Sequence, residues 1–233
     1  MTHPGEQFYP EGVRWDAPIA RGTLPDLLAT AVADYGSRPA LEVRDRPISF
    51  AELQARVDQV AAAFLRDGVG KGHSVALFLG NSPDHPINFF GALKAGARLV
   101  HLSPLDGEIA LSHKLTDSGA RVLVTSNLSA LLPMALRFLG KGLLDKLIVC
   151  EDDDWGAVGT PQTALPDDPR AITFKTFVAG APQPAQWPRI DVEDVALLQY
   201  TGGTTGLPKG AMLSHRNLTS AVSIYDVWGA KAR

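Results

Sequence analysis

Short apolar segments alternate with amphipathic segments along the middle of this 233-residue chain. The apolar segments have the length of strands, and between them apolar residues recur at helical spacing. The expected strands are 74–79, 98–102, 121–125 and 146–150, and the expected helices between them are 83–95, 106–118 and 127–139. Continuously apolar strands separated by helices pair in parallel and are covered on both faces. We therefore predict an α/β fold with a mostly parallel sheet and helices on both faces.

The segments on either side of this alternation predict the rest of the fold. Residues 1–22 are polar and contain proline, so we expect an irregular arm. Thr23 is placed to cap a first helix, and Ser49 with Glu52 forms a capping box for a second helix, which Gly68 ends. A small strand pair is expected at 40–44 and 47–49. The stretch 151–190 is expected to be mostly loop, with a short ordered piece at 172–178. Two further strands are expected at 195–200 and 210–213, and a last helix from 214 onward.

Composition narrows the class of protein. The content of 45% hydrophobic and 20% charged residues is typical of a soluble globular protein. The formal net charge of −3 gives no electrostatic reason to expect a nucleic-acid partner. No apolar run approaches the length of a membrane span, and residues 1–12 lack the apolar centre of a signal peptide. We expect a cytoplasmic protein without an integral membrane segment.

The cysteine, the histidines and the acidic run of this sequence do not indicate a catalytic or metal-binding site. Cys150 is the one cysteine, which excludes an internal disulfide, and we expect it to be a buried apolar residue. The six histidines show no paired spacing that is typical of a metal site, and we expect His215 either to lie at the surface or to pack at the start of the last helix. The acidic run 151–154 is expected to be a solvated loop. No metal ligand is therefore predicted.

A glycine-rich segment, 200–210, follows directly after the strand expected at 195–200. Its glycines allow positive φ angles, so backbone N–H groups can approach a ligand and form an anion-binding nest. Threonine hydroxyls add hydrogen-bond donors, and Lys209 adds a full positive charge. Ligands of parallel α/β sheets bind beyond the carboxyl ends of the strands, where this segment begins. The ligand that these features favour is a polyphosphate.

Two familiar phosphate-binding motifs do not match this segment. A Walker A loop requires Ser or Thr after its lysine, whereas Lys209 is followed by Gly210. The dinucleotide pattern G-x-G-x-x-G is excluded because Gly202 and Gly203 are adjacent. The segment 210–213 predicts a strand, whereas both of those motifs lead directly into a helix. Taken alone, a Gly-Gly-x-x-Gly pattern is also compatible with a plain turn.

The complete string Tyr-Thr-Gly-Gly-Thr-Thr-Gly-Leu-Pro-Lys-Gly at 200–210 resembles the phosphate-loop signature of the adenylate-forming (AMP-binding) superfamily. This superfamily includes acyl-CoA synthetases, firefly luciferases and the adenylation domains of peptide synthetases. The resemblance extends over most of 23–220 through further motifs, which lie at 81–83, 91–97, 103–104, 117–120 and 211–218. Ser103-Pro104 departs from the family, which commonly has Asn-Pro there. The sequence of residues 198–203 is most similar to that of the long-chain fatty-acid–CoA ligase branch.

The resemblance implies a two-step reaction. A carboxylic acid attacks ATP, in the presence of Mg²⁺, to give an acyl-adenylate and pyrophosphate, and coenzyme A then displaces AMP. The residues expected to bind ATP on this basis are Thr201, Gly202, Gly203, Thr204, Thr205, Gly206, Lys209 and Gly210. Of these, Lys209 and Thr204 are expected to be catalytic, with Lys209 offsetting negative charge on the departing pyrophosphate. The implied partners are small molecules: the acid, ATP and coenzyme A.

The resemblance also implies a division of the chain. After the arm 1–22, residues 23–233 are expected to form the N-terminal part of the AMP-binding domain. The family's adenine and magnesium motif, most of its acyl pocket and its mobile C-terminal domain follow downstream, so we expect little turnover from these residues alone. Alternative functions are a phosphotransferase or NTPase, and a non-catalytic nucleotide-binding module. The sequence leaves open the oligomeric state and the acid, which could be fatty or dicarboxylic.

Overall fold

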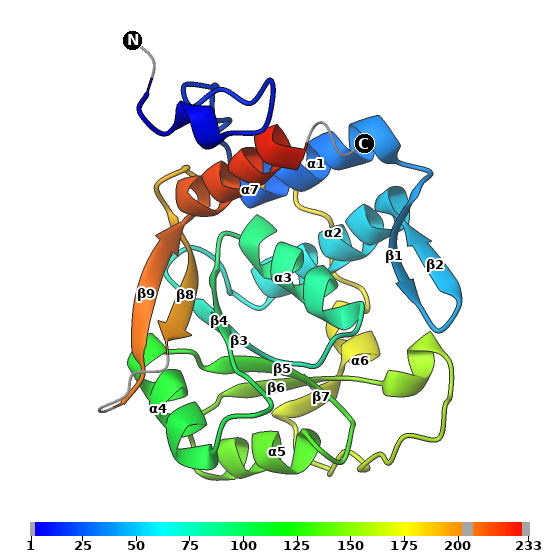
Figure 1. Ribbon diagram of the computed structural model, residues 1–233. Helices are drawn as coiled ribbons and strands as arrows, with labels where there is room; N and C mark the ends of the chain where they lie inside the picture. The colour runs from blue at the N-terminus through cyan, green and yellow to red at the C-terminus, as the bar shows by residue number, and fades with distance from the viewer. Residues whose placement is uncertain (1–2, 202–206, 230–233) are drawn as a thin grey trace.

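The computed structural model describes residues 3–201 and 207–229. Its centre is a seven-stranded sheet with the strand order β7-β6-β5-β3-β4-β8-β9 (Figure 1). The strands are β3 (Ser74–Phe78), β4 (Arg98–His101), β5 (Val122–Ser126), β6 (Lys146–Cys150), β7 (Ala171–Thr173), β8 (Val195–Thr201) and β9 (Lys209–Ser214). All neighbouring pairs are parallel except β8 and β9, which form an antiparallel hairpin. The predicted α/β fold with a mostly parallel sheet is confirmed.

Helices cover both faces of this sheet (Figure 1). One face carries α1 (Leu24–Tyr35), α2 (Phe50–Arg66), α3 (Asp84–Lys94) and α6 (Phe174–Val178), with α7 (His215–Gly229) beside α1. The other face carries α4 (Glu108–Ser118) and α5 (Leu132–Gly140). A separate small hairpin, β1 (Pro39–Val43) with β2 (Arg46–Ser49), precedes α2. The capping box predicted at the start of α2 is present, with reciprocal bonds between Ser49 and Glu52.

The sheet separates two hydrophobic cores because side chains alternate along each strand. On β3, Val75 and Leu77 belong to the core under α2 and α3, whereas Ala76 and Phe78 belong to the core over α4 and α5. All residues of β3 are buried. This two-sided burial explains why the strands have the uninterrupted apolar sequences from which a parallel sheet was predicted.

Two expected elements differ from the structure. The helix expected at 127–139 begins only at Leu132, because the preceding residues bond to a distant segment. Leu128 bridges to Gln162, and the Ser129 N–H donates to the Pro161 carbonyl at 2.9 Å. The ordered piece expected at 172–178 divides into β7 and α6, and the Thr173 side chain caps α6 by accepting a hydrogen bond from the backbone of Thr176.

The last helix docks on the first through its initial residue. His215 is 2% exposed, and its Nδ1 accepts a hydrogen bond from the backbone N–H of Leu24 at 3.1 Å. Of the two places expected for His215, the surface and the packed helix start, the structure has the second. Within the described ranges, none of the helices combines the length and apolar character that crossing a bilayer requires.

The contact between α2 and α3 gives a sharp test of packing. A Cβ atom added to Gly91 would lie 2.3 Å from Cγ1 and 2.7 Å from Cβ of Val60, which is fully buried. We predict that Gly91→Ala lowers the free energy of unfolding by about 1–3 kcal/mol, because the helices must separate. Gly140→Ala is the matched control, since its Cβ would meet no atom within 4 Å. Urea unfolding of both variants checks the prediction, and equal stability of the two would contradict it.

Candidate functional site

The candidate site lies where β8 ends and β9 begins, beyond the carboxyl end of the sheet. The hairpin places Thr201 directly opposite Lys209, and both residues are exposed. Residues 202–206, which include the predicted site residues Gly202, Gly203, Thr204, Thr205 and Gly206, lie outside the described residues. A hydroxyl-bearing residue and an ammonium-bearing residue therefore lie opposite each other on the two strands that flank the glycine-rich segment.

Gly210 has a packing role that the sequence did not reveal. It is paired with Tyr200 across the hairpin, and a Cβ atom at this position would lie 3.0 Å from Cζ of the tyrosine ring. Tyr200 is itself 8% exposed and belongs to the core on the α4 side. The absence of a side chain at Gly210 thus makes room for this ring, and its contact with a ligand stays a prediction.

The Tyr200 hydroxyl makes a hydrogen bond within the protein. It donates a hydrogen bond to Oδ2 of Asp117 on α4 at 2.6 Å. Burial, together with this neighbouring carboxylate, raises the pKa of Tyr200 above its ordinary value. The phenol is therefore neutral at physiological pH and holds the strand that leads into the loop.

A hollow of about 350 Å³ lies beside the loop, beyond the carboxyl ends of β3, β4 and β8. Its lining includes Leu79, His101, Gln199, Tyr200 and Pro208. Nε2 of His101 is buried and has no hydrogen-bond partner. Burial, with a smaller effect of the neighbouring His85, lowers the pKa of His101 to about 4. At neutral pH this imidazole is uncharged.

The two histidines at this edge come from different elements. The ring centroids of His85, at the start of α3, and His101, at the end of β4, are 4.9 Å apart. Their spacing in the sequence gave no sign of this contact. In the part of the chain that the structure describes, however, no three His, Cys, Asp or Glu side chains come together to hold a metal ion.

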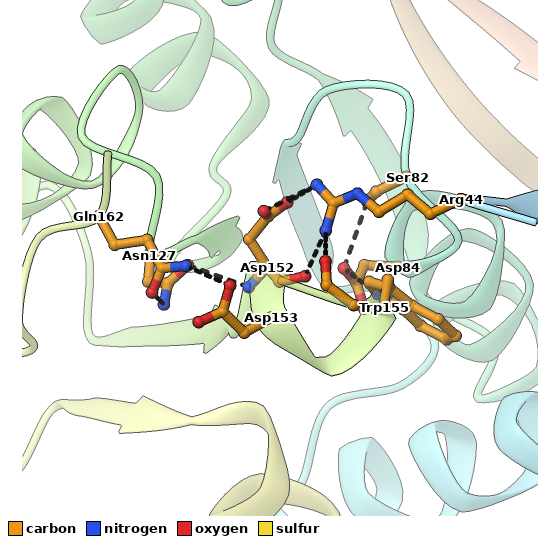
Figure 2. Close-up of polar contacts among 9 residues, drawn as sticks. Arg44, Ser82, Asp84, Asn127, Asp152, Asp153, Trp155 and Gln162 are labelled. Atoms are coloured by element: carbon orange, nitrogen blue, oxygen red, sulfur yellow. Dashed lines mark hydrogen bonds and ion pairs between the residues drawn. The ribbon is translucent and has the colours of Figure 1, made fainter. Parts of the chain in front are cut away.

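The acidic run after β6 is only in part the solvated loop that was expected. It forms a short 3-10 helix, η2 (Asp152–Trp155), in which Asp153 and Asp154 are exposed but Asp152 is only 8% exposed. Figure 2 shows how Arg44 holds this carboxylate with two hydrogen bonds, of 3.0 and 2.8 Å, and donates further to the carbonyls of Asp152 and Gly156. Arg44 lies in the β1–β2 turn at φ 50°, so this turn is attached to the carboxyl end of β6. The partner that buries Asp152 is 108 residues away in the sequence, which is why the local pattern did not predict it.

Further polar contacts lie beside the Arg44–Asp152 pair, and together they form the polar frame of this edge (Figure 2). Nε1 of Trp155 donates to Oδ2 of Asp84 at 2.9 Å, and the Ser82 hydroxyl donates to the same oxygen at 3.2 Å. Burial raises the pKa of Asp84. Cys150, beside this cluster, is 1% exposed, so the expectation of a buried cysteine is confirmed. Burial raises the pKa of its thiol well above the ordinary value, which leaves the thiol protonated and unreactive.

The family model for AMP-binding enzymes matches residues 28–232. The chain belongs to the AMP-binding enzyme family. The superfamily resemblance carried by the segment 200–210 is thereby confirmed.

Two curated relatives of this AMP-binding family member, from different bacteria, have the same name. The long-chain-fatty-acid–CoA ligase of Bacillus subtilis is 29% identical, with 94% of this chain and 41% of that protein covered. The long-chain-fatty-acid–CoA ligase of Escherichia coli O6:H1 is 35% identical, with 84% of this chain and 37% of that protein covered. The chain therefore spans about two fifths of the length of the curated relatives that it matches.

Solved structures of the family have the same fold. The anthranilate CoA ligase AuaEII, in complex with anthranoyl-AMP, matches with a TM-score of 0.71 and 25% identity over 86% of this chain and 36% of that chain. A protein described as a putative long-chain-fatty-acid CoA ligase from Rhodopseudomonas palustris matches with a TM-score of 0.72 and 22% identity, over 88% and 48% of the two chains. The second likeness, at this identity, concerns the fold alone.

Arg44 and Arg121 allow a matched test of the polar frame in this AMP-binding family member. Each guanidinium binds an aspartate with two hydrogen bonds and donates to a glycine carbonyl, but the Arg44–Asp152 pair is 26% and 10% exposed, whereas Arg121–Asp145 is 50% and 66% exposed. We predict that Arg44→Ala lowers the free energy of unfolding by about 1.5–3 kcal/mol, because Asp152 is left buried and unpaired. Arg121→Ala should cost less than about 1 kcal/mol. Chemical denaturation measures both, and similar losses would contradict the burial argument.

His101 predicts a particular dependence of stability on pH. In the unfolded chain its imidazole takes up a proton near pH 6.5. In the folded protein it does so only near pH 4. Because the unfolded state binds more protons between these values, the free energy of unfolding should fall as the pH falls from 6.5 to 4. His101→Gln should make this decline shallower, although burial also lowers the pKa of His85 and His215, which both proteins retain. Urea unfolding at several pH values checks the slope, and identical slopes for the two proteins would refute it.

Proposed function

We propose that residues 23–233 form the ATP-binding, N-terminal part of the AMP-binding domain of an acid–thiol ligase. The reaction is adenylation of a carboxylic acid with release of pyrophosphate, followed by formation of the coenzyme A thioester. One observation carries the proposal: in a chain of the AMP-binding family, the β8–β9 hairpin presents Thr201 and Lys209 face to face at the mouth of the glycine-rich loop. The sheet's carboxyl edge, where this loop lies, is the usual ligand edge of such folds.

The chemistry explains why such a loop is needed. A carboxylate is a weak nucleophile, and it must approach a polyphosphate of the same charge. Neutralising that charge and aligning the reactants overcomes the barrier, and alignment alone contributes about 7–11 kcal/mol. In the proposed arrangement, the N–H groups of the loop glycines and the hydroxyls of Thr204 and Thr205 bind the β- and γ-phosphates. Lys209 offsets charge on the leaving pyrophosphate.

The proposal assigns no magnesium ligand to this chain. The described residues contain no cluster of carboxylates or imidazoles suited to a metal ion. Magnesium and coenzyme A are included because the reaction class requires them. The proposal also includes a cytoplasmic location, where ATP and coenzyme A are both present.

The proposed acid is hydrophobic. Curated relatives that are 35% identical are named long-chain-fatty-acid–CoA ligases, and a 28% identical relative from Arabidopsis thaliana is named 4-coumarate–CoA ligase 4. On the basis of these names, we propose a fatty acid as the first substrate to test. Aromatic and dicarboxylic acids belong in the same panel.

The test is carboxylate-dependent exchange of pyrophosphate into ATP by the complete gene product. We predict that Lys209→Ala lowers the exchange rate about 100-fold, in line with the loss of one charged transition-state contact. Stability should be unchanged, because Lys209 is exposed at the end of an edge strand. Lys141→Ala, which removes an exposed lysine at the end of α5, is the charge-matched control and should keep full activity. An absence of exchange with every acid, together with release of ADP, would favour the phosphotransferase instead.

A further inference from the structure

We propose that α4 positions the facing ends of β8 and β9, where Thr201 and Lys209 flank the glycine-rich segment, with His113 and Asp117 as the positioning residues. The inference rests on the proposed function, because it concerns the residues that flank the same segment. It assigns to α4 a role in ATP binding even though α4 lies outside the glycine-rich motif.

The first contact holds the strand that enters the loop. Tyr200 directly precedes Thr201, and its hydroxyl donates to Oδ2 of Asp117 at 2.6 Å. The ammonium of Lys114 lies 5.6 Å from the centre of the same ring and pairs with Asp106 at 2.6 Å. The Tyr200 side chain is thus fixed by α4 on the face of the sheet opposite α3.

The second contact holds the strand that leaves the loop. Nε2 of His113 donates to the backbone carbonyl of Pro208 at 2.9 Å, and Pro208 directly precedes Lys209. The His113 ring also meets the Tyr200 ring edge-on, with centroids 6.4 Å apart. His113 and Asp117 are four residues apart, so they project from the same side of the helix. One helical turn therefore contacts both ends of the loop.

The exit strand has few other anchors. Among the described residues, β9 pairs with β8 alone and forms the edge of the sheet. Pro208 has no N–H group and cannot donate to the strand ladder. The ladder with β8 fixes β9 along Tyr200–Gly210 and Thr201–Lys209, and the parallel pairing of β8 with β4 fixes the hairpin to the sheet. The hydrogen bond from His113 adds an anchor outside this ladder, at the residue that directly precedes Lys209.

This geometry predicts a selective kinetic effect. Replacing His113 by Ala should raise the KM for ATP about three- to tenfold, the size expected from one hydrogen bond. The KM for the carboxylic acid should not change. His113→Gln, whose amide can donate to the same carbonyl, should restore most of the ATP affinity. Thr116→Ala is the matched control, because its hydroxyl bonds only within α4, to the Ser112 carbonyl.

The proposed positioning and the proposed function fail in different ways. Suppose that the wild type shows acid-dependent exchange. An unchanged KM for ATP in His113→Ala, or an equal rise of this KM in Thr116→Ala, would then overturn the positioning role alone. Absence of exchange in the wild type would overturn the proposed function.

Hydrogen–deuterium exchange gives a readout that needs no activity. The amides at the start of β9 that donate to β8 should exchange faster in His113→Ala than in Thr116→Ala, while those of β3 stay protected in both. Equal exchange in the two variants would overturn the positioning role.

Discussion

The burial of β3 on both faces is the constraint on which the rest of the structure depends. Its five residues are all buried, and it pairs in parallel with β4 on one side and β5 on the other. Two-sided burial requires helices above and below the sheet, and parallel pairing brings the carboxyl ends of the strands to one edge. The place of the candidate site follows from this arrangement. The strands themselves are buried, so the polar residues of the site lie in the loops at the ends of the strands.

That edge combines satisfied and unsatisfied polar groups. Arg44 satisfies Asp152, and Trp155 with Ser82 satisfies Asp84, so the loops after β3 and β6 are held rigidly. Among the described residues, the buried polar side-chain atoms without a partner are Asn88 Oδ1, His101 Nε2 and Ser126 Oγ. His101 and Ser126 end β4 and β5, and Asn88 lies on α3, which begins at the same edge. Local departures from complete hydrogen bonding are typical of the parts of a fold that serve function rather than stability.

The sequence predicted those features that depend on local pattern. Apolar runs located β3 to β6, the capping box of Ser49 and Glu52 located the start of α2, and strands were expected on both sides of the glycine segment, where β8 and β9 lie. Features set by distant partners escaped prediction. The pairing of Leu128 with Gln162 delays the start of α5, and Arg44 buries Asp152. His113 reaches Pro208 from a helix 95 residues earlier in the chain.

The β8–β9 hairpin separates the residues that give rigidity from the residue that carries charge. Tyr200 is buried in the core beside α4, and Gly210 leaves space for its ring. Lys209, next to Gly210, is exposed to solvent. Because burial would favour the neutral amine, a lysine that must offset phosphate charge is best placed at an exposed strand end. Its position must then be fixed by neighbours, and the contacts of α4 with Tyr200 and Pro208 are placed to do so.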